Sequence, residues 1–389
     1  MLSKRMSDIA PFHVMKLLAR AKQLQAAGRD IIHMEVGEPD FQTPDAITQA
    51  GIHALETGKT FYTPATGLPA LRKAIADYYH NHYGVDIDPN RVIVTPGSSG
   101  ALQLLMILLI NPGDEVLLPD PGYPCNRHFV RLVEGSPLSI PVSSESNYQV
   151  TEDVAKKYWG ENSKAVLLAS PSNPTGSTIP LEEVGKLLKF LDDKQGYLIV
   201  DEIYQGLTFD DESQTALKLD SENLFVVNSF SKYFGMTGWR LGWMVIPEAY
   251  VEAADRLAQN VYLAPQTMAQ YAALEAFSEE TLVLLNERRD ELKRRRDFLI
   301  PALEKLGFKL SQVPNGAFYL YMDCSDVIKG IATDSEQFAI DLLEKTGVAI
   351  TPGLDFGENE PEQHVRFTFT TSIDRLEEAV KRIADYLER

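Results

Sequence analysis

Short apolar runs alternate with stretches of helical periodicity through most of the chain. Runs rich in β-branched residues and leucine predict strands, and they lie at 91–95, 114–120, 164–170, 197–202, 224–230 and 243–246. Helical spacing fills the intervals, for example at 101–110 and 181–194. Buried strands that alternate with helices are typical of a mostly parallel sheet covered on both faces. We therefore predict a large α/β domain over residues 45–285.

The pattern changes after a long helical region at 267–305. Strand-like stretches at 307–325, 348–353 and 364–371 then surround a predicted helix at 335–347, and an amphipathic helix is predicted at 373–389. Near the start of the chain, residues 14–28 are predicted as a helix, and a short strand follows and breaks at Gly37. These segments predict a smaller α+β domain that combines residues 1–44 with 286–389.

Length and composition are those of a soluble globular protein. The 389 residues exceed one ordinary core, and 44% hydrophobic with 24% charged residues is a typical globular balance. With 55 acidic and 37 basic side chains the net charge is −18, which repels nucleic-acid phosphates. The basic cluster at 287–297 contains interleaved acids and is predicted to be a solvated helix with i to i+4 ion pairs. No nucleic-acid partner is expected.

Neither a metal site nor a membrane span is expected. Cys125 and Cys324 lie far apart in the sequence, without disulfide-framework or metal-ligand spacing. The N-terminal stretch lacks the apolar region of a signal peptide, and the longest apolar run, at 101–110, is about half of what a membrane span needs. A cytoplasmic location is the resulting expectation.

Unusual polar residues follow several predicted strands. Gly97-Ser98-Ser99-Gly100, Ser170 to Gly176, Asp201 to Tyr204 and Ser229 to Lys232 each come directly after or at the end of an apolar run. In open α/β sheets, ligands gather at the carboxyl ends of the strands. These residues are therefore candidates for one site.

Each candidate has an ordinary structural interpretation beside the functional one. The turn at 97–100 can cap a helix or bind an anion, and Asp201 can cap a helix, form a salt bridge or face a cationic ligand. Lys232 alone would be a surface lysine, but near Arg240 and partly desolvated it would have a lowered pKa and act as an amine nucleophile. A phosphorylated pyridine aldehyde needs an amine, an acid and a phosphate-binding turn. One cofactor of this kind therefore accounts for Lys232, Asp201 and the turn at 97–100.

The motifs resemble those of one family across nearly the whole chain. VGEPDF, YTPATGLPALR, PGSSGAL, PGYP, SPSNPTG, DEIY, SFSKYFGMTGWRLGW and VRFTFT occur in the order found in class I aminotransferases, which are fold-type I pyridoxal 5′-phosphate enzymes. The resemblance implies a large α/β domain with a mostly parallel sheet, a small α+β domain and a homodimer with shared active sites. It also implies a transferase of amino acid metabolism.

The resemblance implies a role for each matching residue. Lys232 would hold the cofactor covalently and later move the proton, Asp201 would pair with the pyridine nitrogen, and Asn173 and Tyr204 would bind the phenolate oxygen. The other implied cofactor-binding residues are Ser98, Ser99, Ser229, Ser231 and Arg240, with Tyr123 stacked on the ring and Tyr62 supplied by the neighbouring subunit. Arg366, assisted by Asn173 and the Gly37 backbone, would bind the substrate carboxylate in a domain that closes.

The substrate is less determined than the cofactor. Some aspartate-using relatives carry a lysine in the PGSSGAL region, where this chain has Ser98, Ser99 and Gly100. We therefore expect a neutral donor such as alanine and an oxo-acid acceptor such as 2-oxoglutarate, with aspartate as an alternative donor. A carbon–sulfur β-lyase is a further alternative, which the DEIY and GWRLGW forms disfavour. A non-catalytic regulator is disfavoured by the negative charge and by the short stretch before VGEPDF.

Overall fold

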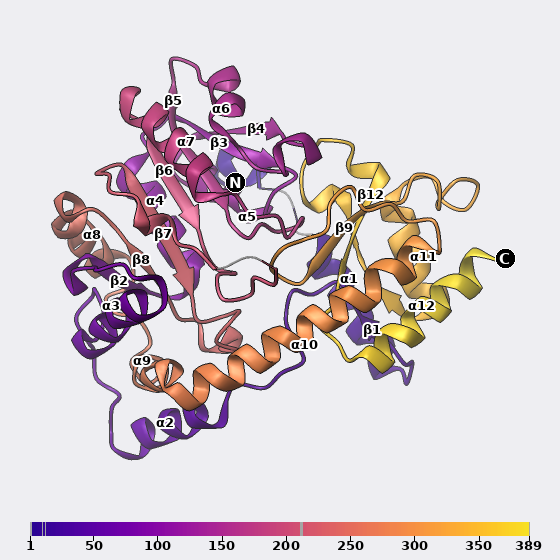
Figure 1. Cartoon of the computed structure of the whole chain (residues 1–389), viewed down its shortest axis with the longest axis horizontal. Coiled ribbons are helices and arrows are strands. Elements are labelled where there is room, and N and C mark those ends of the chain that lie inside the picture. Colours follow the sequence, from indigo (N-terminus) through magenta and orange to yellow (C-terminus); the bar gives the residue numbers. More distant parts are fainter. Residues whose placement is uncertain (1, 10, 12, 211–212, 389) are drawn as a thin grey trace.

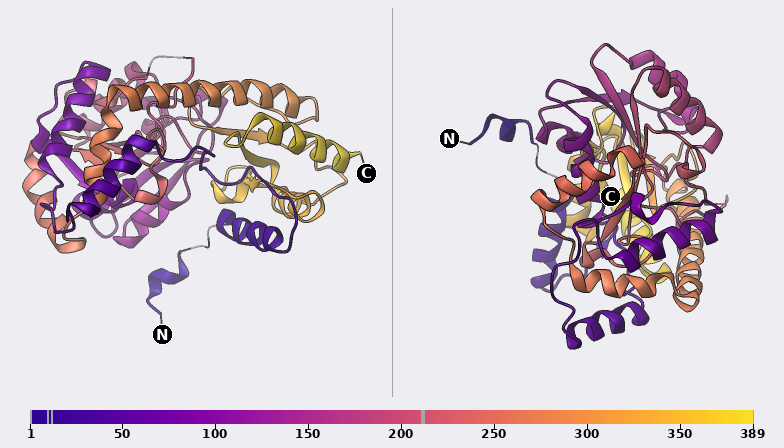
Figure 2. Two further views of the ribbon diagram at one scale, coloured as in Figure 1. Left: turned by 90° about the horizontal axis from the view of Figure 1, so that it is seen from below. Right: turned by 90° about the vertical axis from the view of Figure 1, so that its left-hand side faces the viewer.

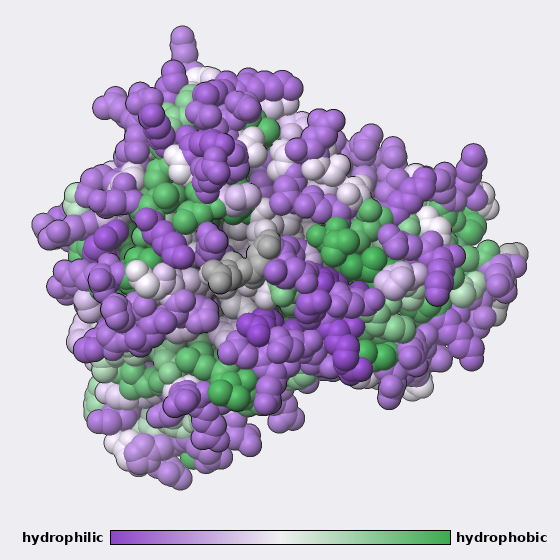
Figure 3. Space-filling model, viewed as in Figure 1, coloured by the Kyte–Doolittle hydropathy of each residue, from purple (hydrophilic) through white to green (hydrophobic). Residues whose placement is uncertain are grey.

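The computed structural model describes residues 2–9, 11, 13–210 and 213–388. The predicted domain ranges and the predicted terminal helix also include residues 1, 10, 12, 211, 212 and 389, which lie outside the described residues. In the described part of the chain, no helix combines the length and apolarity that a bilayer crossing requires. Hydrophilic side chains cover much of the face seen in Figure 3, with separate apolar patches between them.

A mixed sheet forms the core of the larger part of the molecule (Figure 1). Within the described residues it has seven strands in the order β2-β8-β7-β6-β5-β3-β4. The strands are β2 (Val92–Thr95), β3 (Glu115–Asp120), β4 (Ser136–Pro141), β5 (Ser163–Ala169), β6 (Tyr197–Asp201), β7 (Leu224–Ser229) and β8 (Gly242–Val245). Every pairing is parallel except the two that β8 makes with β2 and β7. The predicted mostly parallel α/β sheet is confirmed.

Apolar side chains cover both faces of this sheet, because successive residues of a strand point to opposite sides. Ile199 and Val227 belong to a core cluster shared with α4 (Gly97–Leu109), α5 (Cys125–Leu132) and α8 (Glu248–Val261). Leu198 and Val200 belong to a cluster shared with α6 (Glu152–Tyr158) and α7 (Leu181–Asp193). The inner strands, which are covered on both faces, therefore need the continuous apolar runs that the sequence shows.

Three further helices flank this part of the molecule. They are α2 (Asp45–Glu56), α3 (Pro69–Tyr83) and α9 (Thr267–Ala273). The helices α2 and α9 lie against each other, and they stand together near the lower left edge of Figure 1. Their neighbourhood includes the exposed loop that carries Tyr62.

A second, smaller sheet lies in the C-terminal part. It consists of β9 (Tyr319–Asp323), β11 (Thr351–Pro352) and β12 (His364–Thr368), paired antiparallel in the order β11-β12-β9. The N-terminal strand β1 (Ile32–His33) pairs with β10 (Val348–Ala349) in parallel. The helices α1 (His13–Ala26), α11 (Ser335–Thr346) and α12 (Ile373–Leu387) pack beside these strands.

The long helix α10 (Glu279–Glu304) runs from the larger part to the smaller one, as both Figure 1 and the left view of Figure 2 show. The i to i+4 ion pairs predicted for its basic cluster are present between Lys293 and Asp297 and between Arg295 and Glu291, but the prediction that the cluster is solvated is wrong for two arginines. Arg295 and Arg296 are only 4% and 3% exposed. Arg295 donates to Asp40 Oδ1 at 2.8 Å, and Arg296 donates to Asp210 Oδ2 at 2.7 Å. The helix buries this side because it packs under the loops that carry the two aspartates.

Candidate active site

The carboxyl ends of β5, β6 and β7 meet the segment after β1 and the strand β12 at a cavity of about 220 Å³. Many of the residues predicted to form the site line this cavity: Gly37, Ser98, Tyr123, Asn173, Asp201, Tyr204, Lys232 and Arg366. Five further predicted residues lie outside the cavity wall: Ser99, Ser229, Ser231, Arg240 and Tyr62. The fold therefore brings the predicted amine, acid and guanidinium together from distant segments.

Lys232 lies in the loop after β7, with its amine enclosed by the cavity wall. Its Nζ donates to the Gly37 carbonyl at 2.7 Å and stands 5.9 Å from the centre of the Tyr204 ring. Burial lowers the pKa of the amine from 10.5 to about 8, because desolvation disfavours the charged form. The carboxylate of Glu38 opposes this shift, whereas Arg366 and Arg240 add to it. The neutral, nucleophilic amine is thus populated near neutral pH.

Asp201 ends β6 and is 5% exposed. One carboxylate oxygen accepts a hydrogen bond from the Ile203 backbone N–H at 3.1 Å. Burial raises the pKa of this carboxyl to about 7, against the smaller lowering effects of that hydrogen bond and of Lys232. A cationic nitrogen in the cavity would favour the charged form, which the surrounding apolar strand ends disfavour.

Tyr204 pairs with a residue that the sequence did not single out. Its hydroxyl lies 2.6 Å from the hydroxyl of Tyr319, and burial raises the pKa of both phenols. Tyr319 also packs against the backbone of Gly37, where an added Cβ would lie 2.1 Å from the Tyr319 hydroxyl. Only glycine fits at position 37. The alternation of YLYMD could have placed Tyr319 on one face of a strand, but not toward this cavity.

Arg366 is buried in β12 and already has several partners. Its Nη1 donates to Asn173 Oδ1 at 2.8 Å, and its Nη2 donates to the Glu35 carbonyl and to Thr351 Oγ1. The guanidinium carbon lies 4.4 Å from the centre of the Tyr319 ring. The predicted neighbourhood of Arg366 and Asn173 is present, whereas the contacts from Glu35 and Thr351 were not predicted. Strand pairing supplies Thr351, since β11 lies beside β12.

A group of hydrogen-bond donors lies at the start of α4. The helix begins at Gly97, so Ser98 and Ser99 belong to its first turn, and the N–H groups of such a turn point outward. Gly97 has a φ of +73°, and a Cβ there would lie 2.8 Å from Nη2 of Arg240. Free N–H groups, the Ser98 hydroxyl and a guanidinium together match what a phosphate requires.

Two predicted serines bond mainly within their own loop. Ser229 Oγ lies 3.0 Å from Ser231 Oγ and 3.1 Å from the Leu241 carbonyl, and it accepts from the Ser231 backbone N–H. These bonds fix the turn that carries Lys232. Tyr123 is half-buried on the cavity wall, whereas Tyr62 is 81% exposed and lies off the wall.

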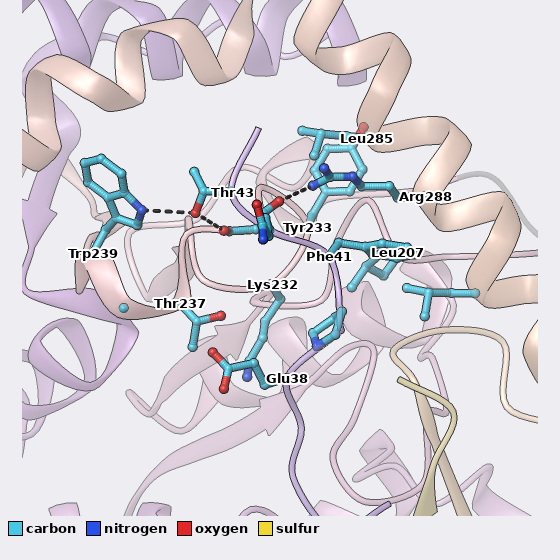
Figure 4. Close-up of a pocket in the computed structure, with 15 residues that line it drawn as sticks. Glu38, Phe41, Thr43, Leu207, Lys232, Tyr233, Thr237, Trp239, Leu285 and Arg288 are labelled. Atoms are coloured by element: carbon cyan, nitrogen blue, oxygen red, sulfur yellow. Dashed lines mark hydrogen bonds between the residues drawn. The ribbon is translucent and has the colours of Figure 1, made fainter. Parts of the chain in front are cut away.

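A second cavity, of about 470 Å³, also borders Lys232 (Figure 4). Its wall combines polar and apolar side chains, among them Phe41, Thr43, Trp239 and Arg288. Trp239 Nε1 donates to Thr43 Oγ1 at 3.1 Å, and Arg288 donates to the Gln42 carbonyl at 2.7 Å. Glu38, Lys232 and Thr237 line both cavities.

Fold and cavity define an α/β enzyme whose centre joins an amine, a carboxylate and a guanidinium. Residues 29–383 match the family described as aminotransferase class I and II, and the chain belongs to this family. Members of the family are aminotransferases that depend on pyridoxal phosphate. The resemblance, the fold class and the enzyme class predicted from the motifs are confirmed.

Three relatives indicate the range of activities around this chain. A (5-formylfuran-3-yl)methyl phosphate transaminase from Methanocaldococcus jannaschii is 36% identical and covers 100% of both chains. A valine–pyruvate aminotransferase from Mycobacterium tuberculosis is 35% identical, covering 98% of this chain and 97% of its own. The structure of aspartate aminotransferase from Thermus thermophilus with maleate has a TM-score of 0.92 at 33% identity and covers 99% of both chains. The names agree on the reaction class and differ in the substrate.

Proposed function

We propose that this enzyme binds pyridoxal 5′-phosphate and transfers the amino group of a neutral L-amino acid to a 2-oxo acid. The observation that carries the proposal is the meeting of Lys232, Asp201 and Arg366 in one cavity. These three residues come from the loop after β7, the end of β6 and the strand β12. Their side chains supply the amine, the anion and the fork-shaped cation that the reaction requires.

The residues around the cavity fit the cofactor. Bound pyridoxal phosphate supplies an aldehyde and a ring that withdraws electrons from the substrate's reacting carbon. Asp201 offers a carboxylate for the ring nitrogen, and the first turn of α4 with Arg240 offers donors for the phosphate. Asn173 and Tyr204 offer donors for the phenolate oxygen, and Tyr123 offers an aromatic face. We assign Ser99, Ser229 and Ser231 to the same phosphate-binding region.

In the reaction, Arg366 would bind the substrate carboxylate through two parallel hydrogen bonds. Asn173 and the Gly37 backbone would hold the same end of the substrate and so orient its Cα. Lys232, once released by the incoming amino group, would take a proton from Cα and return it on the cofactor side. The lowered pKa of Lys232, about 8, suits a base that must be neutral when it acts.

The cavity wall favours a neutral donor. Val14, Met15 and Val36 contribute apolar surface, and Lys232 and Arg366 are the cations among the described residues that line the cavity. Both cations already have proposed roles, so a distal substrate carboxylate would lack a partner there. The name of the M. tuberculosis relative supports valine-like donors as well as alanine, and pyruvate as an acceptor beside 2-oxoglutarate. The T. thermophilus relative keeps aspartate as the alternative donor.

We also propose the division into domains and the dimer that the sequence predicts. The pairing of β1 with β10 supports joining residues 1–44 to 286–389 around a large domain of residues 45–285. The boundary at 285 falls inside α10, which continues from one part to the other. Phe61 and Tyr62 are 83% and 81% exposed, which suits a loop that reaches a partner subunit's cavity. We also propose the cytoplasmic location that the sequence predicts.

The test is a donor panel with the purified enzyme supplied with cofactor. Each single amino acid is added without an oxo acid, and its oxo acid and the pyridoxamine form of the cofactor are measured. Conversion by alanine or valine, with aspartate at least tenfold slower, is the expected result. Faster conversion by aspartate would favour the alternative donor. Pyruvate and ammonia from a β-substituted amino acid, without the pyridoxamine form, would establish a lyase instead.

A further inference from the structure

One backbone segment connects the two cations of the site. The Glu35 carbonyl accepts a hydrogen bond from Arg366, and two residues later the Gly37 carbonyl accepts one from Lys232 at 2.7 Å. Gly37 is pressed against Tyr319, so the segment has little freedom there. Glu38 is the next residue, and its side chain starts from this fixed point.

The far end of the segment is fixed as well. The backbone N–H of Asp40 donates to the Thr370 carbonyl at 3.0 Å, and the Asp40 carboxylate accepts from the buried Arg295 at 2.8 Å. The guanidinium of Arg295 also lies 5.0 Å from the centre of the Phe41 ring. Glu38 therefore stands between two anchored neighbours, which limits where its carboxylate can go.

Glu38 and Lys232 line both cavities and so form part of the wall between them. Figure 4 shows the Glu38 carboxylate beside the amine end of Lys232, with Thr237 next to both. The charged groups that act on Lys232 from its surroundings are Glu38 and Asp201, which are acidic, and Arg366 and Arg240, which are basic. Among these four, Glu38 exerts the largest effect. The phenol of Tyr204 is a further titratable group beside the amine, and Tyr123, Tyr319 and Tyr233 line the cavities that the amine borders.

Under the proposed function, Glu38 is the carboxylate that remains available to interact with the Lys232 amine. Asp201 would pair with the ring nitrogen of the cofactor, and Arg366 with the substrate carboxylate, so neither charge would remain directed at the amine. Glu38 is an exposed residue that lines the second cavity as well as the first, so solvent can reach its carboxylate. Its charge therefore persists when the cofactor and the substrate are bound.

We propose that Glu38 is a positioning residue for Lys232: its carboxylate holds the charged form of the amine at the Gly37 side of the cavity. The second cavity gives this pair a path to water that is separate from the substrate-binding side. This inference rests on the proposed role of Lys232. Loss of the Glu38 charge would release the amine and make it neutral at lower pH.

The test measures Lys232 in the cofactor-free protein, so it does not depend on activity. The pH dependence of reductive methylation at Lys232 is followed by peptide mass spectrometry in wild type, Glu38→Gln and Glu38→Asp. Glu56→Gln, which removes an exposed acid at the end of α2, is the matched control. In Glu38→Gln the labelling midpoint should fall by about half a pH unit, a modest shift because solvent screens an exposed charge. Glu38→Asp and the control should stay near the wild-type midpoint.

An unchanged labelling midpoint in Glu38→Gln would overturn the proposal. An equal fall of the midpoint in Glu38→Asp would overturn it too, because side-chain shape rather than charge would then set the pKa of Lys232. A second readout is the acid limb of the kcat profile of the cofactor-loaded enzyme, which should move in the same direction with little change in KM. Failure of the proposed function is recognised separately. If Lys232→Ala still binds cofactor covalently, the role of Lys232 is wrong whatever the labelling midpoint.

Discussion

Burial decides the chemistry of Asp201, at the end of β6, and of Lys232, in the loop that follows the neighbouring strand β7. It lowers the pKa of Lys232 to about 8 and raises that of Asp201 to about 7. Without cofactor, a fraction of each group is therefore neutral near neutral pH, where an exposed lysine or aspartate would be almost fully charged. A bound cofactor ring with a cationic nitrogen would relieve the cost at Asp201. Residues that destabilise the empty protein are thus the ones proposed to act in the reaction.

Asp201→Asn should make the cofactor-free protein more stable at high pH. The folded-state pKa, about 7, lies above the ordinary value of 3.8, so folding takes up a proton between these values and the wild-type free energy of unfolding falls as pH rises through this range. Asparagine does not titrate. Its advantage over wild type should grow between pH 4 and 7 and reach at most about 4 kcal/mol. Urea unfolding at pH 5 and pH 8 measures it, and an identical pH dependence in both proteins would contradict the prediction.

Arg366→Lys should lower kcat/KM for every donor. An ammonium cannot reproduce two parallel hydrogen bonds to a carboxylate, and it leaves Asn173 and the Glu35 carbonyl without their present donor. We expect kcat/KM to fall about a hundredfold, which corresponds to about two to three kcal/mol of transition-state stabilisation. Arg375→Lys, a partly exposed change at the start of α12 where Arg375 pairs with Asp30, should leave kcat/KM unchanged. An equal kcat/KM in wild type and Arg366→Lys would assign the carboxylate to another residue.

The motifs identified the polar residues at the strand ends and Arg366, but not the other residues of the cavity wall or the contacts between them. Tyr319, Glu35 and Thr351 reach the site through the smaller sheet and the segment beside it, so their proximity depends on strand pairing. Apolar alternation predicts that a residue is buried, not which cavity it faces. The role of Glu38 needed the positions of both cavities.

Among the elements, the sequence predicted long apolar strands well and short or polar ones poorly. Strand β4 was missed because SPLSIP contains two prolines and polar residues, which an edge strand tolerates. The reversed direction of β8 was not predicted, because an apolar run is the same in either direction. Helix α4 begins at Gly97 rather than 101, since a glycine-serine stretch has low helix propensity until the sheet packs against it.

Two neighbouring arginines of α10 should differ in their contribution to stability. Arg295 is buried against Asp40 and the Thr370 carbonyl, whereas Arg294 is exposed and pairs with Glu291. Arg295→Met should lower the free energy of unfolding by about 2–3 kcal/mol, because it leaves buried polar groups without a partner. Arg294→Met should change it by less than about 0.5 kcal/mol. Urea unfolding measures both, and equal effects would mean that the helix has no fixed contact with the segment at 40.

Across the whole molecule, segments far apart in the sequence build the site. The N-terminal strand β1 pairs with β10, and α1 is capped by Asp355, whose carboxylate accepts from the backbone N–H groups of His13 and Val14 at 2.7 Å. The same helix brings Val14 and Met15 to the cavity wall. Under the proposed function, substrate selectivity would be divided among several segments, so local motifs constrain the donor less than they constrain the cofactor.

Mixing two inactive variants tests the proposed sharing of sites between subunits. Lys232→Ala removes the amine, and Tyr62→Ala removes the exposed tyrosine. If Tyr62 serves the partner's cavity, each mixed dimer has one intact site, and random exchange should restore about a quarter of wild-type activity. If Tyr62 serves its own cavity, no mixed dimer has an intact site. Activity after unfolding and refolding the mixture, against each variant treated alone, decides between them.

The most direct test of the central claim is the absorption spectrum of the enzyme supplied with pyridoxal phosphate, in wild type and in Lys232→Ala. The wild type should show the visible band of lysine-bound cofactor and lose it on addition of an amino acid donor. Lys232→Ala should lack that band and catalyse no transfer, while Lys189→Ala, an exposed lysine on α7, should match the wild type. A visible lysine-bound band and full transfer in Lys232→Ala would contradict the account.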